Sequence, residues 1–228
     1  MAQAAYFTPE LFRFLKELKD HNRRGWFEEN KARYEEYVRE PFLRLIGDLA
    51  PDLGKINPHM RADPRPTGGS LMRIHRDIRF SKDKSPYKTF AAAHFGHAQA
   101  SDGAKPAYYL HLEPGRSSIG AGVWRPEPGP LKNIRDAIVK HSRDWEEITA
   151  NRDFQSTCGM AGESLRRPPV GYDPQHPLIE DIKRKDFVTS SRLTNHEVCA
   201  KDFRAIVLGH FRKMAPLLRF LSEAVGLP

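Results

Sequence analysis

The chain has few cysteines and no long apolar run. Cys158 and Cys199 are far apart in the 228-residue chain, and their spacing fits neither a metal site nor a disulfide framework. No stretch approaches the roughly eighteen apolar residues of a transmembrane helix. The N-terminus also lacks the basic and apolar regions of a secretory signal. These absences predict a cytoplasmic protein in a reducing compartment that does not span a membrane.

Several signatures of catalysis are missing as well. The sequence has no nucleophile elbow, no Ser-His-Asp order and no nucleotide-binding fingerprint. His94, His97 and His111 fall in or beside predicted strands, but their spacing is loose and no acidic motif accompanies them. We therefore expect no metal site and no cofactor.

The composition is that of a folded protein. Hydrophobic residues make up 39% of the chain and aromatic residues 10%, which supplies a core and argues against extended disorder. The sequence shows no internal repeat and no linker composition. At this length, one domain over residues 1–228 is the expected organisation.

The basic charge of the chain is concentrated in one region. The whole protein carries a formal net charge of +8. Residues 1–60 contain ten Lys or Arg and ten Asp or Glu, so their net charge is zero. Residues 61–100 contain eight Lys or Arg and three Asp or Glu, a net charge of +5. A local excess of this kind predicts a confined site for an anion rather than a long nucleic-acid-binding face.

The segment 73–88, R-I-H-R-D-I-R-F-S-K-D-K-S-P-Y-K, holds much of this excess. It contains six cations and two acids, and it interleaves hydroxyl groups that donate hydrogen bonds to phosphate or carboxylate oxygens. Its lack of glycine sets it apart from phosphate-cradling loops. We predict that it binds an anion through Arg73, Arg76, Arg79, Lys82, Lys84, Tyr87 and Lys88.

Apolar and polar residues alternate from 72 to 80, which predicts a half-buried strand. Arg76 breaks the alternation: residues two apart along a strand share a face, so Arg76 would lie on the apolar face with Ile74 and Ile78. An unpaired buried charge is costly, so Arg76 is expected either to pair with a carboxylate or to line a cleft. Asp77, Asp83 and an acid of the second helix are the candidate partners.

The remaining periodicity predicts an α+β fold, with an antiparallel sheet of at least four strands flanked by N- and C-terminal helices. Helices are expected from Thr8-Pro9, from near Trp26 to Pro51 with a kink at Pro41, after Pro130, and over 201–225. Residues 156–178 read as a long loop. The expected strands are 72–80, 90–95, 107–112, 118–124 and a short one within 185–192.

Three histidines are candidate acid–base groups: His75 in the basic segment, His111 in a strand, and His176 in the long loop. The aromatic residues Tyr108, Tyr109 and Trp124 would suit base stacking. Packing in the core explains them more simply.

Five segments together resemble the family named domain of unknown function 2461, a group of conserved hypothetical proteins. They are 21–34 (H-N-R-R-G-W-F-E-E-N-K-A-R-Y), 73–88, 108–115 (Y-Y-L-H-L-E-P-G), 122–127 (G-V-W-R-P-E) and 169–177 (P-V-G-Y-D-P-Q-H-P). Two departures occur in the last segment, at Val170 and Gln175, where the family pattern has Lys and Asp. The resemblance covers nearly the whole chain, implies one domain and supplies no activity.

Three hypotheses follow from the residues. The first is a domain that binds a phosphate-containing anion through 73–88, the partner being an anionic small molecule or a nucleic acid. The second is a metal-independent hydrolase or transferase acting on a phosphate ester, with arginines stabilising the developing charge. In the third, the charges of the segment form internal ion pairs. The oligomeric state is not readable from the sequence.

Overall fold

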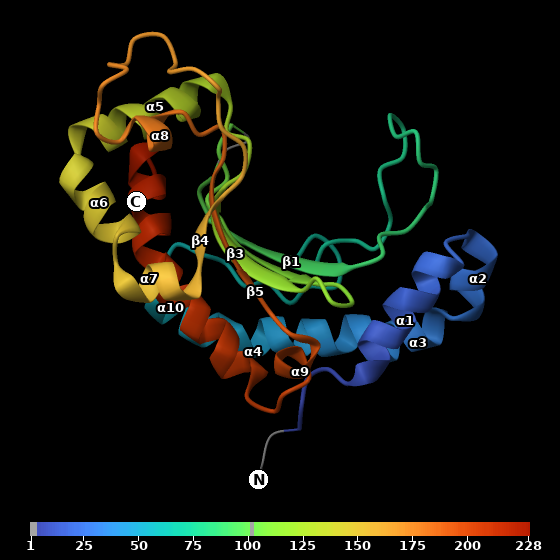
Figure 1. Ribbon diagram of the computed structural model, residues 1–228. Helices are drawn as coiled ribbons and strands as arrows, with labels where there is room; N and C mark the ends of the chain where they lie inside the picture. Colours follow the sequence, from blue (N-terminus) through green and yellow to red (C-terminus); the bar gives the residue numbers. More distant parts are fainter. Residues whose placement is uncertain (1–3, 101–102) are drawn as a thin grey trace.

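The computed structural model describes residues 4–100 and 103–228, in which five strands form one antiparallel sheet (Figure 1). The spatial order is β1-β2-β3-β5-β4. The strands are β1 (Ala91–Gly96), β2 (Ala107–Leu112), β3 (Ser118–Val123), β4 (Gly159–Ala161) and β5 (Phe187–Arg192). With helices at both ends of the chain, this architecture confirms the predicted α+β class.

The helical elements precede, interrupt and follow the sheet. They are α1 (Pro9–Asp20), α2 (Arg24–Glu29), α3 (Lys31–Tyr34), the π-helical turn η1 (Glu35–Arg39), α4 (Glu40–Ile56), α5 (Pro128–Lys140), α6 (Ser142–Thr149), α7 (Arg152–Thr157), α8 (Ile179–Ile182), α9 (Asn195–Val198) and α10 (Phe203–Ala224). The irregularity expected at Pro41 is the π-helical turn directly before it, and α4 continues through Pro51.

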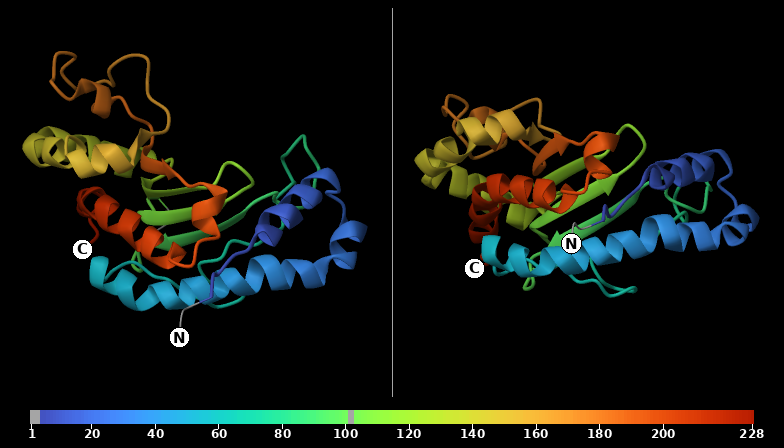
Figure 2. Two further views of the ribbon diagram at one scale, coloured as in Figure 1. Left: turned by 60° about the horizontal axis from the view of Figure 1, so that its bottom comes forward. Right: turned by 90° about the horizontal axis from the view of Figure 1, so that it is seen from below.

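One face of the sheet forms the core. Tyr108, Leu110 and Ile119 share this face because residues two apart along a strand point the same way, and all three are fully buried. Figure 2 shows α4 and α10, which contact each other, lying against this side of the sheet. Burial of their apolar stripes against the strands is the main stabilising contribution of the fold.

The opposite face is more open. Along β1 and β2 it carries His94, Tyr109 and His111, which are exposed or half-buried. Figure 1 shows no helix over this half of the face, which lies between α5 and the loop that rises beyond β1. This side is not open throughout, because Ala92 of β1 and Gly120 of β3 on the same face are buried.

Gly122 is required where β3 meets β5. Its φ of 137° lies in a region that favours glycine, and an added Cβ would lie 2.0 Å from the carbonyl oxygen of Phe187. The close approach of the two backbones accounts for this glycine within a strand.

The predicted strand at 72–80 is wrong. Only isolated bridges form there, Leu71 with Ala93 and His75 with Tyr87. The chain leaves the edge of the sheet and returns as an irregular two-stranded loop, which we call the basic ribbon (residues 73–88). Phe80, expected to face the core, is 96% exposed. A two-stranded ribbon has no second layer to bury one face, so its apolar alternation does not produce a regular strand.

Two further differences concern the strands. Gly159–Ala161 forms β4 within the stretch predicted to be a loop, and the short strand expected within 185–192 is β5, which begins at Phe187. Among the described residues, no helix has the length and apolarity needed to cross a membrane.

Candidate anion-binding cleft

The basic ribbon lies against the N-terminal helices. The Asn22 side chain accepts a hydrogen bond from the Tyr87 N–H (3.0 Å) and donates one to the Tyr87 carbonyl (2.9 Å). The Tyr87 ring stacks on Phe27 of α2, with centroids 4.2 Å apart. These contacts fix the base of the ribbon beside α2 and α3.

The two arms of the ribbon are joined by backbone hydrogen bonds. The Arg76 N–H donates to the Pro86 carbonyl (2.9 Å), and the Lys88 N–H donates to the Ile74 carbonyl (2.8 Å). Lys88 and Arg73 are thereby brought side by side, because the Lys88 ammonium also donates to the Arg73 carbonyl (2.8 Å).

A cleft of about 840 Å³ separates the ribbon from these helices. Its walls come from three parts of the chain. They are Phe27, Lys31, Tyr34, Glu35 and Arg39 from α2 to η1; Pro66, Thr67, Gly68, Gly69 and Leu71 from the loop before the ribbon; and Met72, Arg73, Ile74, His75, Asp77 and Lys88 from the ribbon and the residue before it. We call it the ribbon cleft. π-Helical turns such as η1 are frequent at functional sites.

Two cations of the ribbon cleft have no direct protein partner. Within the described residues, neither Lys31 nor Arg73 makes a side-chain hydrogen bond or a close ion pair, and both are exposed. Asp77, which also lines the cleft, pairs with Arg79 and interacts with Arg73 only through its charge. Arg39 is neutralised by Glu35 at 2.6 Å. The cleft thus presents an excess of positive charge from two walls.

Lys88 is the third cation of the cleft. It is half-buried, and its ammonium donates to the backbone carbonyl of Arg73 rather than to a carboxylate. Burial, and secondarily the charge of Arg73, lowers the pKa of Lys88. A bound anion would raise this pKa again, because its negative charge favours the charged ammonium.

The loop before the ribbon is a tight turn over residues 66–68 that is followed by a second glycine, Gly69. Gly68 has a φ of 73°, and an added Cβ at Gly69 would lie 2.5 Å from the Arg65 carbonyl oxygen. The loop therefore needs both glycines, and turns of this kind are suited to anions because they let a ligand approach the backbone N–H groups.

Three other cations of the ribbon lie outside the cleft lining and have protein partners. Arg76 is partly buried and pairs with Asp83 at 2.5 Å, one of the three candidate partners. Arg79 is 77% exposed and pairs with Asp77 at 2.7 Å. The Lys84 ammonium donates to the Ile78 carbonyl at 3.0 Å.

The last two predicted anion-binding residues also lie outside the cleft lining. Lys82 is exposed toward the tip of the ribbon, and Tyr87 is 2% exposed in its stack on Phe27. The structure thus brings two of the seven predicted residues, Arg73 and Lys88, into one cleft.

The three histidine candidates are in different places. His75 lines the ribbon cleft. His111 is on the open sheet face, and His176 is in the loop before α8, where its Nδ1 accepts the Leu178 N–H at 3.1 Å. No group of three or more potential metal ligands occurs among the residues that the structure describes.

The aromatic candidates also separate. Tyr108 is fully buried against Phe211 of α10, whereas Trp124 is 61% exposed and lies beneath the Arg125 guanidinium. They do not form a common stacking platform.

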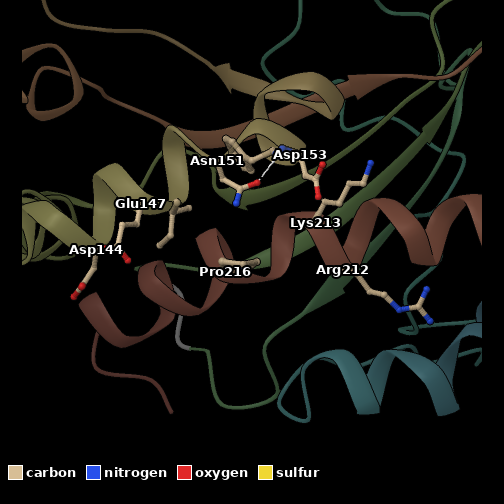
Figure 3. A pocket seen from close by; sticks show the side chains of 9 residues that line it. Asp144, Glu147, Asn151, Asp153, Arg212, Lys213 and Pro216 are labelled. Carbon is tan, nitrogen blue, oxygen red and sulfur yellow. Dashed lines mark hydrogen bonds between the residues drawn. The ribbon is translucent and has the colours of Figure 1, made fainter.

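A second hollow, of about 460 Å³, lies between α6, α7 and α10 (Figure 3). Its charged residues are Asp144, Glu147, Asp153, Arg212 and Lys213, three acids and two bases. Lys213 already donates to Thr157 at 2.7 Å. With more acidic than basic residues, this hollow does not favour the binding of an anion. The ribbon cleft is therefore the better candidate for an anion site.

Lys31 and the loop 66–69 are the parts of the site that sequence reasoning missed. The segment P-T-G-G directly before the ribbon is a readable signal, since adjacent glycines mark a special backbone turn. Nothing in the sequence alone places Lys31 opposite it.

The sequence matches the family model described as conserved hypothetical protein (DUF2461) over residues 10–220. The chain belongs to the DUF2461 family. A comparison with curated proteins gives no match. In this DUF2461 protein, the segments 21–34 and 73–88, which carried the resemblance, meet at the ribbon cleft through Asn22, Phe27 and Tyr87. The family description names no activity.

Proposed function

We propose that the protein binds an anionic, phosphate-containing small molecule in the ribbon cleft. One observation supports this most strongly: Lys31, Arg73 and Lys88 line the same cleft, and none of them pairs with a carboxylate among the described residues. Like charges that are held together without a directly bonded carboxylate favour an anion from outside the chain. Arg73 supplies a planar pair of donors, and the lysines supply point charges.

The cleft also limits the size and character of the ligand. Its volume of about 840 Å³ lies within the usual range for small-molecule sites. Phe27, Tyr34 and Ile74 form an apolar part of the lining. A phosphate group with a compact organic body fits this combination better than a phosphate ion alone.

A phosphate-ester hydrolase or transferase is the second candidate function. It is favoured by His75, which lines the cleft together with Arg73 and Lys88 and would serve as the acid–base group. The internal-pairing hypothesis, in turn, applies to Arg76 and Arg79, which have Asp83 and Asp77 as partners.

We further propose that the chain is one domain in the cytoplasm. The described core is continuous from Phe7 to Leu221, which supports a single folding unit. Both cysteines are free thiols, as in a reducing compartment.

Thermal unfolding at low salt tests the anion site. Inorganic phosphate, a nucleoside monophosphate and a short oligonucleotide should be compared. A ligand at one hundred times its Kd stabilises by about 2.7 kcal/mol, and added salt should weaken the effect. The variants Arg73→Ala and Lys31→Ala should lose most of the gain, whereas Lys82→Ala is the matched control and should keep it.

Two outcomes would contradict the proposal. One is the absence of stabilisation by any of these anions. The other is stabilisation that depends on Lys82 and not on Arg73, which would place binding at the ribbon tip. Phosphate release from 4-nitrophenyl phosphate by the wild type, lost in His75→Ala, would favour the second candidate.

A further inference from the structure

A chain of three titratable side chains lies on the open face of the sheet, apart from the ribbon cleft. The Tyr109 hydroxyl lies 3.3 Å from Nδ1 of His111, and Nε2 of His111 lies 3.1 Å from a carboxylate oxygen of Glu113. All three residues belong to one row along β2 and its end, because residues two apart in a strand share a face. The anion site does not use any of them.

The arrangement defines the state of the imidazole. The Glu113 carboxylate only accepts hydrogen bonds, so Nε2 of His111 carries the proton that is donated to it. Nδ1 is then the acceptor, and the Tyr109 hydroxyl donates to it. A base oriented by a carboxylate is the pattern of a general base in acyl-transfer enzymes.

Neighbouring residues hold this row in place. The His111 ring packs on Phe90, with centroids 4.4 Å apart. Ser117, which is 1% exposed, accepts the Glu113 N–H at 3.1 Å and donates to the Glu113 carbonyl at 3.0 Å. Side chains locked by packing and by hydrogen bonds provide the preorganisation that catalysis needs.

The neighbouring strands determine what lies beside the row. Tyr109 has His94 opposite it on β1 and Gly120, which has no side chain, opposite it on β3. His111 is followed across the sheet by Ser118 and then by Arg192. Arg192 is exposed and makes no ion pair within the described residues.

We propose that this face is a hydrolytic site for carboxylic esters that carry an anionic tail. His111 is the general base, Glu113 is a positioning residue that also stabilises the imidazolium, and Tyr109 is the hydrogen-bond donor to the carbonyl oxygen. Arg192 binds the tail. It lies two strand spacings, about 10 Å, from His111 across the sheet.

The reaction is balanced without a cofactor. Water gives a proton to Nδ1 of His111, and its oxygen adds to the ester carbonyl carbon. The developing oxyanion accepts a hydrogen bond from Tyr109, whose hydroxyl hydrogen turns away from Nδ1. The tetrahedral intermediate then expels the alcohol, which takes the proton back from His111, and the acid and alcohol leave as products.

The chemistry favours an acyl over a phosphoryl centre. Burial raises the pKa of Tyr109, so its phenol remains a neutral donor at physiological pH. Phosphoryl transfer requires several cations around the reacting group. Among the residues in register with His111 across the sheet, Arg192 is the one cation of the described set, and it is two strands away.

Hydrolysis of mono(4-nitrophenyl) glutarate, compared with 4-nitrophenyl acetate, tests this site. The variant His111→Ala should lower kcat about 100-fold or more, the usual range for a general base. His111→Gln, which keeps more of the packing on Phe90, should have the same defect. The matched control is His141→Ala, which removes a surface histidine of the loop before α6 and should leave the rate unchanged.

The positioning and binding roles have separate readouts. Glu113→Gln should lower kcat and leave KM unchanged, whereas Arg192→Ala should raise KM for the glutarate ester alone. Arg73→Ala should affect neither ester, which separates this proposal from the anion site. The proposal is overturned if folded His111→Gln hydrolyses the glutarate ester as fast as the wild type, or if the wild type does not exceed the uncatalysed rate.

Discussion

Asn22 holds the backbone of Tyr87 by two hydrogen bonds, so a single side chain joins the N-terminal helices to the basic ribbon. Tyr87 is almost fully buried, and its backbone groups would otherwise lack these partners. The ribbon cleft therefore depends on a contact between residues 65 positions apart in the sequence.

Replacing Asn22 with Ala should destabilise the protein by about 1–3 kcal/mol, because the buried N–H and carbonyl of Tyr87 lose their partners. Chemical denaturation measures this change. Gln175→Ala removes an exposed amide side chain and is the control, with an expected change within about 0.5 kcal/mol. Equal effects of the two substitutions would contradict the role given to Asn22.

Replacing Tyr108 with Phe should stabilise the protein. The Tyr108 hydroxyl is fully buried and has no hydrogen-bond partner in the described structure, and burial raises its pKa. Removing an unsatisfied buried hydroxyl is expected to raise the free energy of unfolding by about 1–3 kcal/mol. Tyr109→Phe, on the opposite face of the same strand, should give no such gain. A loss of stability in Tyr108→Phe would show that its hydroxyl has a partner.

Sulfate binding should weaken at alkaline pH before an ordinary lysine titrates. Burial lowers the pKa of Lys88, so its ammonium loses the proton below the usual value of about 10.4. Sulfate keeps its charge in this range. Its thermal stabilisation should therefore decline between neutral pH and about pH 10, and Lys88→Arg should remove the decline.

In the absence of ligand, the same rise in pH should stabilise the protein. A charged Lys88 is disfavoured in the folded state, so stability without ligand should rise as the pH passes upward through the lowered pKa. A sulfate effect that is constant to pH 10 in the wild type would exclude Lys88 from the site.

Low pH should destabilise the pairing between the two arms of the basic ribbon. Hydrogen bonds from the side chain and backbone of Ser85, and then from Arg76, hold the pKa of Asp83 well below its usual range. A depressed carboxyl pKa gives stability that is present above about pH 4 and is lost as the pH falls. Asp83→Asn should mimic acid at neutral pH and accelerate amide exchange at Arg76 and Lys88. Asp77→Asn, which removes the ion-pair partner of Arg79, should not.

Most of the fold was predictable because its signals are local. The apolar stripes of α1, α4 and α10 and the alternation in β2 and β3 specify these elements directly. The element β4 was not predictable, since Gly159–Ala161 has low β-propensity and pairs with β5 only through tertiary contact.

The basic ribbon shows why alternation is not sufficient. Ile74 is 6% exposed as predicted, but Met72 is 40% and Phe80 is 96% exposed. The break in the pattern at Arg76 was the available signal, and the pairing of Arg76 with Asp83 is its structural counterpart. For the site, Arg73 and Lys88 were predictable from their charge. The adjacent glycines of the loop 66–69 were a readable signal of a special turn, but only the folded chain brings Lys31 to the same cleft.

Side-chain and backbone NMR of the labelled protein shows directly whether an anion binds in the ribbon cleft. On titration with inorganic phosphate at low salt, we expect saturable shifts of the Arg73 Nε–H and of the Gly68 and Gly69 amides. The Arg79 Nε–H, which already bonds to Asp77, is the internal control and should not move. Saturable shifts at Arg79 and the ribbon tip without any at Arg73, or no saturable shift at all, would exclude anion binding in the cleft.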